Sequence, residues 1–97
     1  MGVIYFISGI VGQHGFVKIG ITRSMLLLRS RFGAIQTSSP LDLRVMGWQE
    51  GDVVLEKTLH EAFRDDHVRG EWFKLSKDIQ EYVRKMCKPV IWRDWSG

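Results

Sequence analysis

Two short apolar stretches near the N-terminus each carry one polar group that could do chemistry. VIYFIS at 3–8 contains the phenol of Tyr5, and FVKIGIT at 16–22 contains the ammonium of Lys18. Both stretches are rich in Val, Ile and Phe, which is typical of β-strands. The link GIVGQHG between them is rich in glycine, so we expect an antiparallel pair. If the register pairs the face of Tyr5 with the face of Lys18, the two side chains are neighbours across the ladder.

Helix-start residues and apolar spacing predict three helices after this pair of strands. The expected N-caps are Thr22, Asp52 and Ser76, and the helices are expected to end near Gln36, near Arg64 and before Pro89. Their inward residues are expected to be Leu28, Phe32 and Ile35, then Leu55, Leu59, Ala62 and Phe63, then Ile79, Tyr82, Val83 and Met86. The alternating stretch 42–48 predicts a third strand. Residues 65–70 are expected to form a loop and 71–75 a short extended piece.

The resulting order, β-β-α-β-α-α, predicts an α+β fold in which helices flank a small three-stranded antiparallel sheet. A chain of 97 residues is expected to form one domain. We assign residues 1–75 to its core. A C-terminal helix and tail, 76–97, are expected to pack on the same domain, and Trp92 and Trp95 make the tail apolar enough to dock on a surface.

Composition limits the classes of function. The net charge of +3 and pI of about 9.3 permit a polyanionic partner without requiring one. The first residues do not resemble a signal peptide, and no apolar run is long enough to span a membrane. The single cysteine, Cys87, excludes an internal disulfide and is typical of a reducing compartment, so we expect a cytoplasmic protein.

Five short motifs occur in a fixed order along the chain: IYF, KIG, RSRFGAIQTSSP, VLEKTLHEAF and RGEWFKL. In this order and spacing the chain resembles the GIY-YIG nuclease superfamily over about residues 3–75. It is most similar to the short phage and bacterial branch whose domains end in GEWF, related to the meiotically up-regulated gene type. The resemblance implies an endonuclease that uses one divalent metal ion, Mg²⁺ or Mn²⁺, to hydrolyse DNA phosphodiester bonds.

The resemblance assigns roles to residues of the two strands. Tyr5 falls on the tyrosine of the first motif, where a phenol would orient or deprotonate the attacking water if nearby cations lower its pKa. Lys18 replaces the tyrosine of the second motif, which puts in doubt any mechanism that needs two phenols. A lysine there could lower the pKa of Tyr5 or contact the phosphate. Gly20 fits the motif glycine, where backbone or substrate comes close.

The arginine of the first helix has two candidates. Counting back from AIQTSSP selects Arg31, and counting forward from KIG favours Arg29. The region RSMLLL is a few residues longer than usual, so we rely on the downstream anchor and choose Arg31 as the catalytic arginine. Its guanidinium fork would grip phosphate. Two positions in a helix are about 200° apart, so both arginines cannot share a face.

The second helix carries the expected metal ligand. Glu56 matches the family's metal-binding glutamate and lies at the edge of the apolar face. His60 lies four residues later on the same face, where it supports the metal site, contacts phosphate or is simply a structural histidine. Glu71 in GEWF is not assigned a catalytic role. Further substrate contacts are expected from Arg29, Gln36 and Arg69.

Two classes of function therefore remain, beside a weaker third idea of a regulator or inhibitor of a host enzyme that works through the tail with Trp92 and Trp95. The first is a GIY-YIG-type endonuclease that contacts the DNA backbone with weak sequence preference, its specificity supplied by homodimerisation or a protein partner. The second is a non-catalytic nucleic-acid- or protein-binding module on the same fold. Zinc quartets, zincin helices and Walker loops are not present in the sequence.

Overall fold

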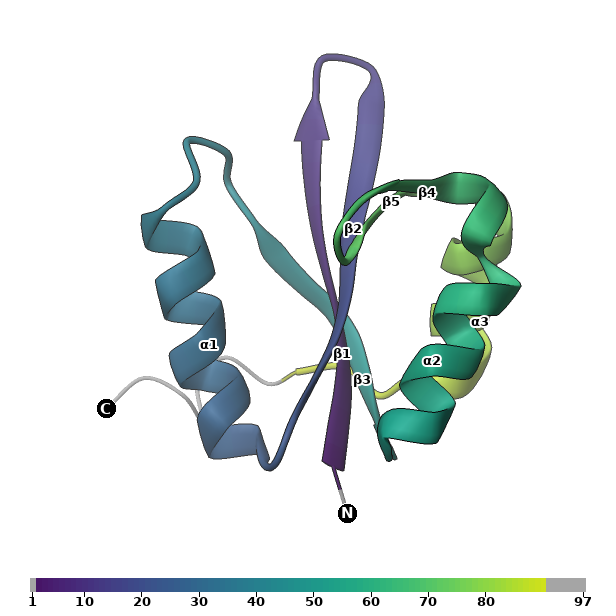
Figure 1. Cartoon of the computed structure of the whole chain (residues 1–97). Coiled ribbons are helices and arrows are strands. Elements are labelled where there is room, and N and C mark those ends of the chain that lie inside the picture. The colour runs from purple at the N-terminus through teal and green to yellow at the C-terminus, as the bar shows by residue number, and fades with distance from the viewer. Residues whose placement is uncertain (1, 91–97) are drawn as a thin grey trace.

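The computed structural model describes residues 2–90 and consists of a five-stranded antiparallel sheet between helices (Figure 1). The elements in chain order are β1 (Gly2–Val11), β2 (His14–Thr22), α1 (Met25–Thr37), β3 (Arg44–Gly51), α2 (Val53–Ala62), a 3₁₀ turn (Arg64–Asp66), β4 (His67–Arg69), β5 (Trp72–Lys74) and α3 (Lys77–Met86). The strand order is β3-β1-β2-β5-β4, and every pairing is antiparallel.

The central strand, β1, is buried on both faces, which explains its unbroken apolar run. Successive side chains of a strand point to opposite faces. Ile4 and Phe6 therefore join the core beneath α2 and α3, whereas Val3, Tyr5 and Ile7 join the core beneath α1. In this way Tyr5 is placed on the α1 face of the sheet.

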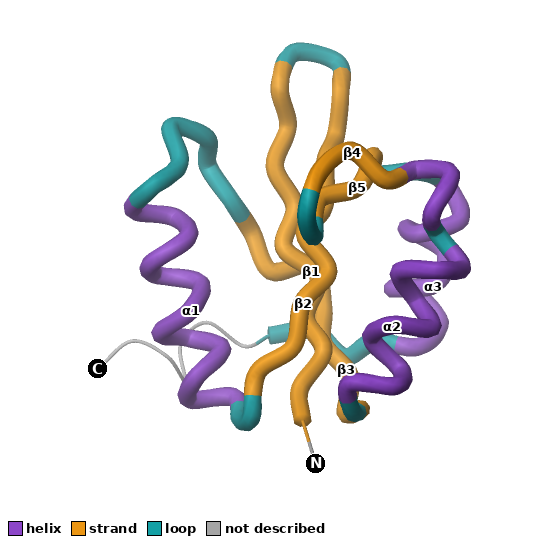
Figure 2. The backbone as a smooth tube through the Cα atoms, in the orientation of Figure 1, coloured by secondary structure: helices purple, strands orange, loops and turns teal. Residues whose placement is uncertain are grey.

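Helices cover the two faces unequally, with α1 alone on one face and α2 and α3 on the other (Figure 2). Leu28, Phe32 and Ile35 of α1 pack on the sheet, as predicted. The short strands β4 and β5 extend the sheet beyond β2. Within β2, however, only Phe16, Val17 and Lys18 pair with β5. The second half of β2 therefore forms an edge of the sheet between α1 and α2.

Two of the three predicted helix caps are confirmed. Asp52 accepts a hydrogen bond from the backbone N–H of Leu55 at 2.9 Å, and Ser76 caps α3 in the same way. The prediction for Thr22 is wrong, because Ser24 caps α1. Thr22 ends β2 and donates its hydroxyl to the backbone oxygen of Ser24 at 3.0 Å.

The expected three-stranded sheet is wrong, because the structure has five strands. Residues 67–69 form β4 where a loop was expected, and 72–74 form β5. Three residues are too few to show alternation in sequence, and only the pairing of β5 with β2 and of β4 with β5 makes them strands. Gly70 allows the tight turn between them, because its φ of +54° lies in the left-handed region. The overall class remains α+β.

The C-terminal helix packs on the same core as α2 through Ile79 and Val83. Met86 was expected to face inward, but its side chain is 56% exposed, and Cys87 packs against the core instead. The tail with Trp92 and Trp95 lies outside the described residues. Within 2–90, none of the helices has the length and apolar character needed to cross a membrane.

Candidate active site

The predicted tyrosine and glycine are direct partners across the first hairpin. Tyr5 of β1 is opposite Gly20 of β2, and Lys18 is opposite Ile7. The expected pairing of Tyr5 with Lys18 is thus a diagonal one on a shared face. A Cβ atom at Gly20 would lie 2.4 Å from the phenol oxygen of Tyr5, so the ring covers this glycine directly. Glycine is needed at this position because the ring fills the space of a side chain.

The phenol of Tyr5 lies in an unusual environment. The side chain is 0% exposed, and its oxygen has no hydrogen-bond partner among the described residues. Burial raises the pKa of Tyr5 above its ordinary value of 10.0, the charge of Glu71 raises it further, and the nearby Arg31 guanidinium opposes them. Cations were expected to lower this pKa, but the structure gives the opposite direction. At neutral pH Tyr5 is therefore an uncharged hydroxyl that can orient a water molecule.

Lys18 forms an ion pair with a residue that had been given no catalytic role. Its Nζ lies 3.0 Å from Oε1 of Glu71, and the two side chains are 18% and 38% exposed. The ammonium also lies 5.8 Å from the centre of the Trp72 ring. Because Glu71 neutralises this ammonium, Lys18 does not act on Tyr5 as a free cation.

The carboxylate of Glu56 faces the same region from α2. Its Oε2 is buried and has no hydrogen-bond partner within residues 2–90. Burial raises the pKa of Glu56 above its ordinary value of 4.5, the Glu71 carboxylate raises it further, and His60 lowers it. Both oxygens of a carboxylate are acceptors, so Glu56 and Glu71 can share a hydrogen bond only when a proton lies between them.

Of the three roles expected for His60, its contacts favour that of a structural histidine. Its Nε2 donates to the backbone oxygen of Ile19 at 2.9 Å, and its ring meets the Phe73 ring edge-on at 4.9 Å between centroids. The backbone N–H of Ile19 in turn donates to the backbone oxygen of Glu71 at 2.9 Å. His60 therefore ties α2 to the open edge of β2, next to Glu56.

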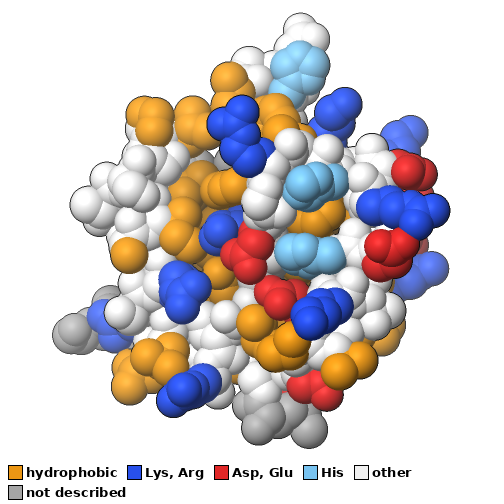
Figure 3. All heavy atoms as spheres, in the orientation of Figure 1, with side chains coloured by type: hydrophobic (Ala, Val, Ile, Leu, Met, Phe, Trp, Pro, Cys, Tyr) orange, Lys and Arg blue, Asp and Glu red, His pale blue; other side chains and the backbone are white. Residues whose placement is uncertain are grey.

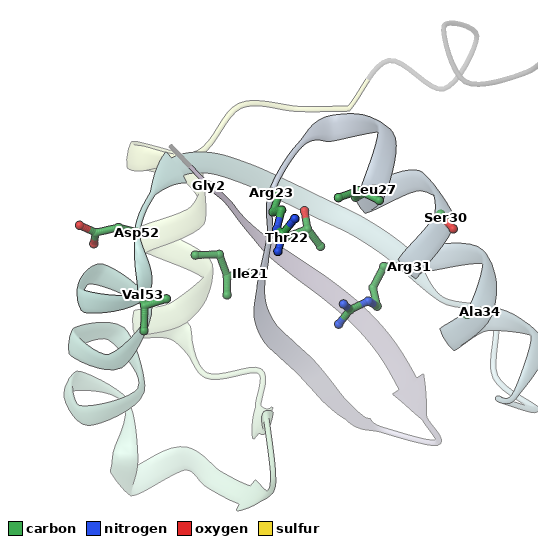
Figure 4. Close-up of a pocket in the computed structure, with 10 residues that line it drawn as sticks. All are labelled: Gly2, Ile21, Thr22, Arg23, Leu27, Ser30, Arg31, Ala34, Asp52 and Val53. Carbon is green, nitrogen blue, oxygen red and sulfur yellow. The ribbon is translucent and has the colours of Figure 1, made fainter.

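Of the two candidate arginines, Arg31 is the one near Tyr5. Figure 4 shows it projecting from α1 toward the strands, along the wall of a cleft of about 910 Å³. Arg23 and Asp52 also line this cleft, together with the aliphatic side chains of Ile21, Leu27, Ala34 and Val53. Arg29 does not line the cleft and is half-buried elsewhere on α1.

The structure brings five polar residues together at the open edge of β2, and we call them the β2 cluster. They are Tyr5, Lys18, Arg31, Glu56 and Glu71, from five different segments of the chain. On the molecular face seen in Figure 3, acidic side chains lie near the middle, with Lys, Arg and His side chains around them. An electropositive surround with an acidic centre is suited to a phosphate and a metal ion together.

Two predicted substrate contacts are not members of the β2 cluster. The amide of Gln36 donates to the backbone oxygen of Leu41 at 2.7 Å and accepts from the backbone N–H of Leu43 at 2.8 Å. These bonds hold the connection between α1 and β3. Arg69 is exposed on β4, opposite Trp72 of β5.

A divalent cation fits the β2 cluster by its donor chemistry. Among residues 2–90 no group of three or more His, Cys, Asp and Glu side chains could hold a metal ion. However, two neighbouring carboxylates and a phenol oxygen are hard oxygen ligands, which suit Mg²⁺ and Mn²⁺. Mg²⁺ usually keeps several waters and needs only one or two carboxylates.

The T5orf172 domain family matches residues 2–88, nearly all of the chain that the structure describes. The chain belongs to this family. T5orf172 domains are found in some proteins associated with GIY-YIG and HNH-like nucleases, which supports a nuclease-like or nucleic-acid-binding function. Neither the curated proteins nor the solved structures yielded a match.

In this T5orf172 domain, sequence reasoning gave Glu71 at most a role supporting the site and no catalytic role. Its position before Trp72 and Phe73 in GEWF looked like part of a packing motif. Phe73 is indeed fully buried, but Glu71, in the turn directly before β5, lies beside Lys18. The opposite charges of Lys18 and Glu71 could have indicated an ion pair. That indication is usable only once β5 is known to pair with β2.

Proposed function

We propose that this protein is a metal-dependent endonuclease that hydrolyses DNA phosphodiester bonds by a GIY-YIG-type, one-metal mechanism. One observation carries the proposal: the buried phenol of Tyr5 lies within electrostatic reach of Arg31, Glu56 and Glu71, which come from three other segments. Membership of the T5orf172 family supports the nuclease class.

Glu56 is the proposed metal ligand, because its buried Oε2 lacks a partner. Bound Mg²⁺ or Mn²⁺ would neutralise charge on the phosphate and lower the pKa of a coordinated water. The protein's own residues supply the rest. The uncharged hydroxyl of Tyr5 orients the attacking water, and the planar fork of Arg31 binds phosphate oxygens and stabilises charge that develops on them.

The cleft beside Arg31 is the proposed path of the DNA strand. It runs along the free edge of β2, with Arg23 and Arg31 on its walls, so a strand that passes through it would bring a phosphate to Arg31, whose charge acts on Tyr5. The polar side chains of the lining are those of Thr22, Arg23, Ser30, Arg31 and Asp52, and the remaining lining residues are aliphatic or glycine, so few groups could read a base. We therefore propose backbone contacts and weak sequence preference.

The decisive experiment measures cleavage of supercoiled plasmid with Mg²⁺ or Mn²⁺ by wild type and Glu56→Ala. Glu61→Ala is the matched control, because Glu61 is an exposed glutamate of the same helix whose partner is Arg64. We expect wild type and Glu61→Ala to nick DNA and Glu56→Ala to lose about a hundredfold or more in rate. Equal rates for all three proteins would remove Glu56 from the mechanism.

A second candidate function is a non-catalytic nucleic-acid-binding module. The ion pair of Lys18 with Glu71 favours it, because this pair takes up a cation that cleavage could use. This candidate predicts salt-sensitive DNA binding without cleavage under any metal. Filter binding at several salt concentrations, beside the cleavage assay, separates the two functions.

A further inference from the structure

Glu71 is held at the β2 cluster by two contacts, one from its backbone and one from its side chain. Its backbone oxygen accepts from the N–H of Ile19 at 2.9 Å, which continues the β2–β5 ladder by one step. Its side chain reaches Lys18 at 3.0 Å. Both contacts come from β2, so Glu71 has a defined place beside the open edge of that strand.

Two buried polar atoms point to a missing positive group at this place. Oε2 of Glu56 and the phenol oxygen of Tyr5 are the buried side-chain atoms that lack a hydrogen-bond partner within residues 2–90. Tyr5 is 0% exposed, and the negative charges of Glu71 and Glu56 act on it together with the positive charge of Arg31. An unpartnered buried oxygen beside two carboxylates is costly unless a cation, a proton or an ordered water lies among them.

We propose that Glu71 is a second carboxylate ligand of the divalent cation held by Glu56, and that Lys18 is a positioning residue that holds Glu71 in place. This rests on the cation assigned to Glu56 by the proposed function and deepens it. The site then has two carboxylate ligands, with the phenol oxygen of Tyr5 beside them to bind a coordinated water.

The charges explain why a lysine suits position 18. Glu56 and Glu71 together carry two negative charges, and Lys18 offsets one of them. Glu56, Glu71 and Lys18 alone therefore keep a net charge of about −1, which still attracts a dication while reducing the repulsion between the carboxylates. Arg31, the fourth charged member of the β2 cluster, is left to bind phosphate. A tyrosine at this position could donate one hydrogen bond to Glu71 but could not offset its charge.

The test is Mn²⁺ binding to the full-length protein, measured by calorimetry and by the loss of the free Mn²⁺ electron paramagnetic resonance signal. The proteins are wild type, Glu56→Gln, Glu71→Gln and the control Glu61→Gln. We expect Glu56→Gln and Glu71→Gln each to weaken binding by about tenfold or more, and Glu61→Gln to bind like wild type. Urea unfolding of each variant confirms that it is folded.

A double-mutant cycle tests the role of Lys18. Lys18→Met is measured in the wild-type background and in the Glu71→Gln background. If Lys18 acts through Glu71, Lys18→Met changes Mn²⁺ affinity in the first background and leaves it unchanged in the second. Equal changes in both backgrounds would overturn the positioning role.

Failure of this inference is distinguishable from failure of the proposed function. If Glu71→Gln binds Mn²⁺ as tightly as wild type, or if wild type binds none, Glu71 is not a ligand and a proton bridges the carboxylates. If both carboxylates are needed for Mn²⁺ but no DNA is cleaved, the two-carboxylate site stands and the nuclease proposal fails. If DNA is cleaved and Glu71→Gln binds Mn²⁺ normally, the nuclease proposal stands and Glu71 is not a metal ligand.

Discussion

The phenol oxygen of Tyr5 lies over Gly20 on the neighbouring strand, where a Cβ atom would come within 2.4 Å of it. Because Tyr5 is fully buried, its ring cannot swing away without disturbing the core. Gly20→Ala should therefore destabilise the protein by about 1–3 kcal/mol in urea unfolding, as overpacking does in a tight core.

The control for this prediction is Gly33→Ala in α1, where nothing lies within 4 Å of the added carbon. Alanine favours helix there, so this variant should be unchanged or more stable by up to about 1 kcal/mol. The Gly20→Ala cost should shrink in a Tyr5→Leu background, where no ring covers Gly20. An equal cost in both backgrounds would mean that the ring is not its source.

Removing the hydroxyl of Tyr5 should separate stability from activity. Its oxygen has no partner, so Tyr5→Phe should leave the free energy of unfolding unchanged or raise it slightly, while DNA cleavage falls about a hundredfold. Tyr82→Phe is the matched control, because the Tyr82 hydroxyl donates to Gln49 outside the β2 cluster. That variant should lose about 1 kcal/mol of stability and keep its activity. Full activity of Tyr5→Phe would contradict the water-positioning role.

Arg31 and Arg29 should differ sharply in a cleavage assay. Arg31→Ala removes the guanidinium that projects into the cleft beside Tyr5, and we expect cleavage to slow by about a hundredfold. Arg29→Ala should change the rate per folded molecule by less than about threefold, since Arg29 does not line the cleft. Arg84→Ala on α3, whose partner is Glu81, controls for the loss of one positive charge. A larger effect at Arg29 would reverse the assignment.

Cys87 should be unreactive in the folded protein. Burial raises the pKa of its thiol to about 12, whereas an exposed thiol ionises near 8.5. At pH 8 the folded protein then holds about one thiolate in 10⁴ molecules, so a chromogenic disulfide reagent should react far more slowly than in urea. Since the thiol ionises more readily when unfolded, stability should fall as pH rises from about 9 toward 12. Fast labelling of folded protein at pH 8 would contradict this, and the single cysteine makes the signal unambiguous.

Local chemistry predicted much of the fold correctly from the sequence. Asp52 and Ser76 cap their helices because a cap depends on a side chain and a backbone N–H three residues away. The apolar face of α1 was also readable, because helical spacing places Leu28, Phe32 and Ile35 on one side. Thr22 was expected to cap the first helix, but β2 extends to Thr22, and the cap falls on Ser24.

The sequence by itself determined the helices, the first hairpin and the residue types from which a phosphate-processing site could be built. Tertiary structure alone decided that Tyr5 covers Gly20, that the three-residue strands β4 and β5 join the sheet, and that Glu71 meets Lys18. The physical reason is the distance along the chain between the residues that interact. A cap or a helical face is set by residues within one or two turns, whereas Lys18 and Glu71 are distant in the chain and meet only because β5 pairs with β2.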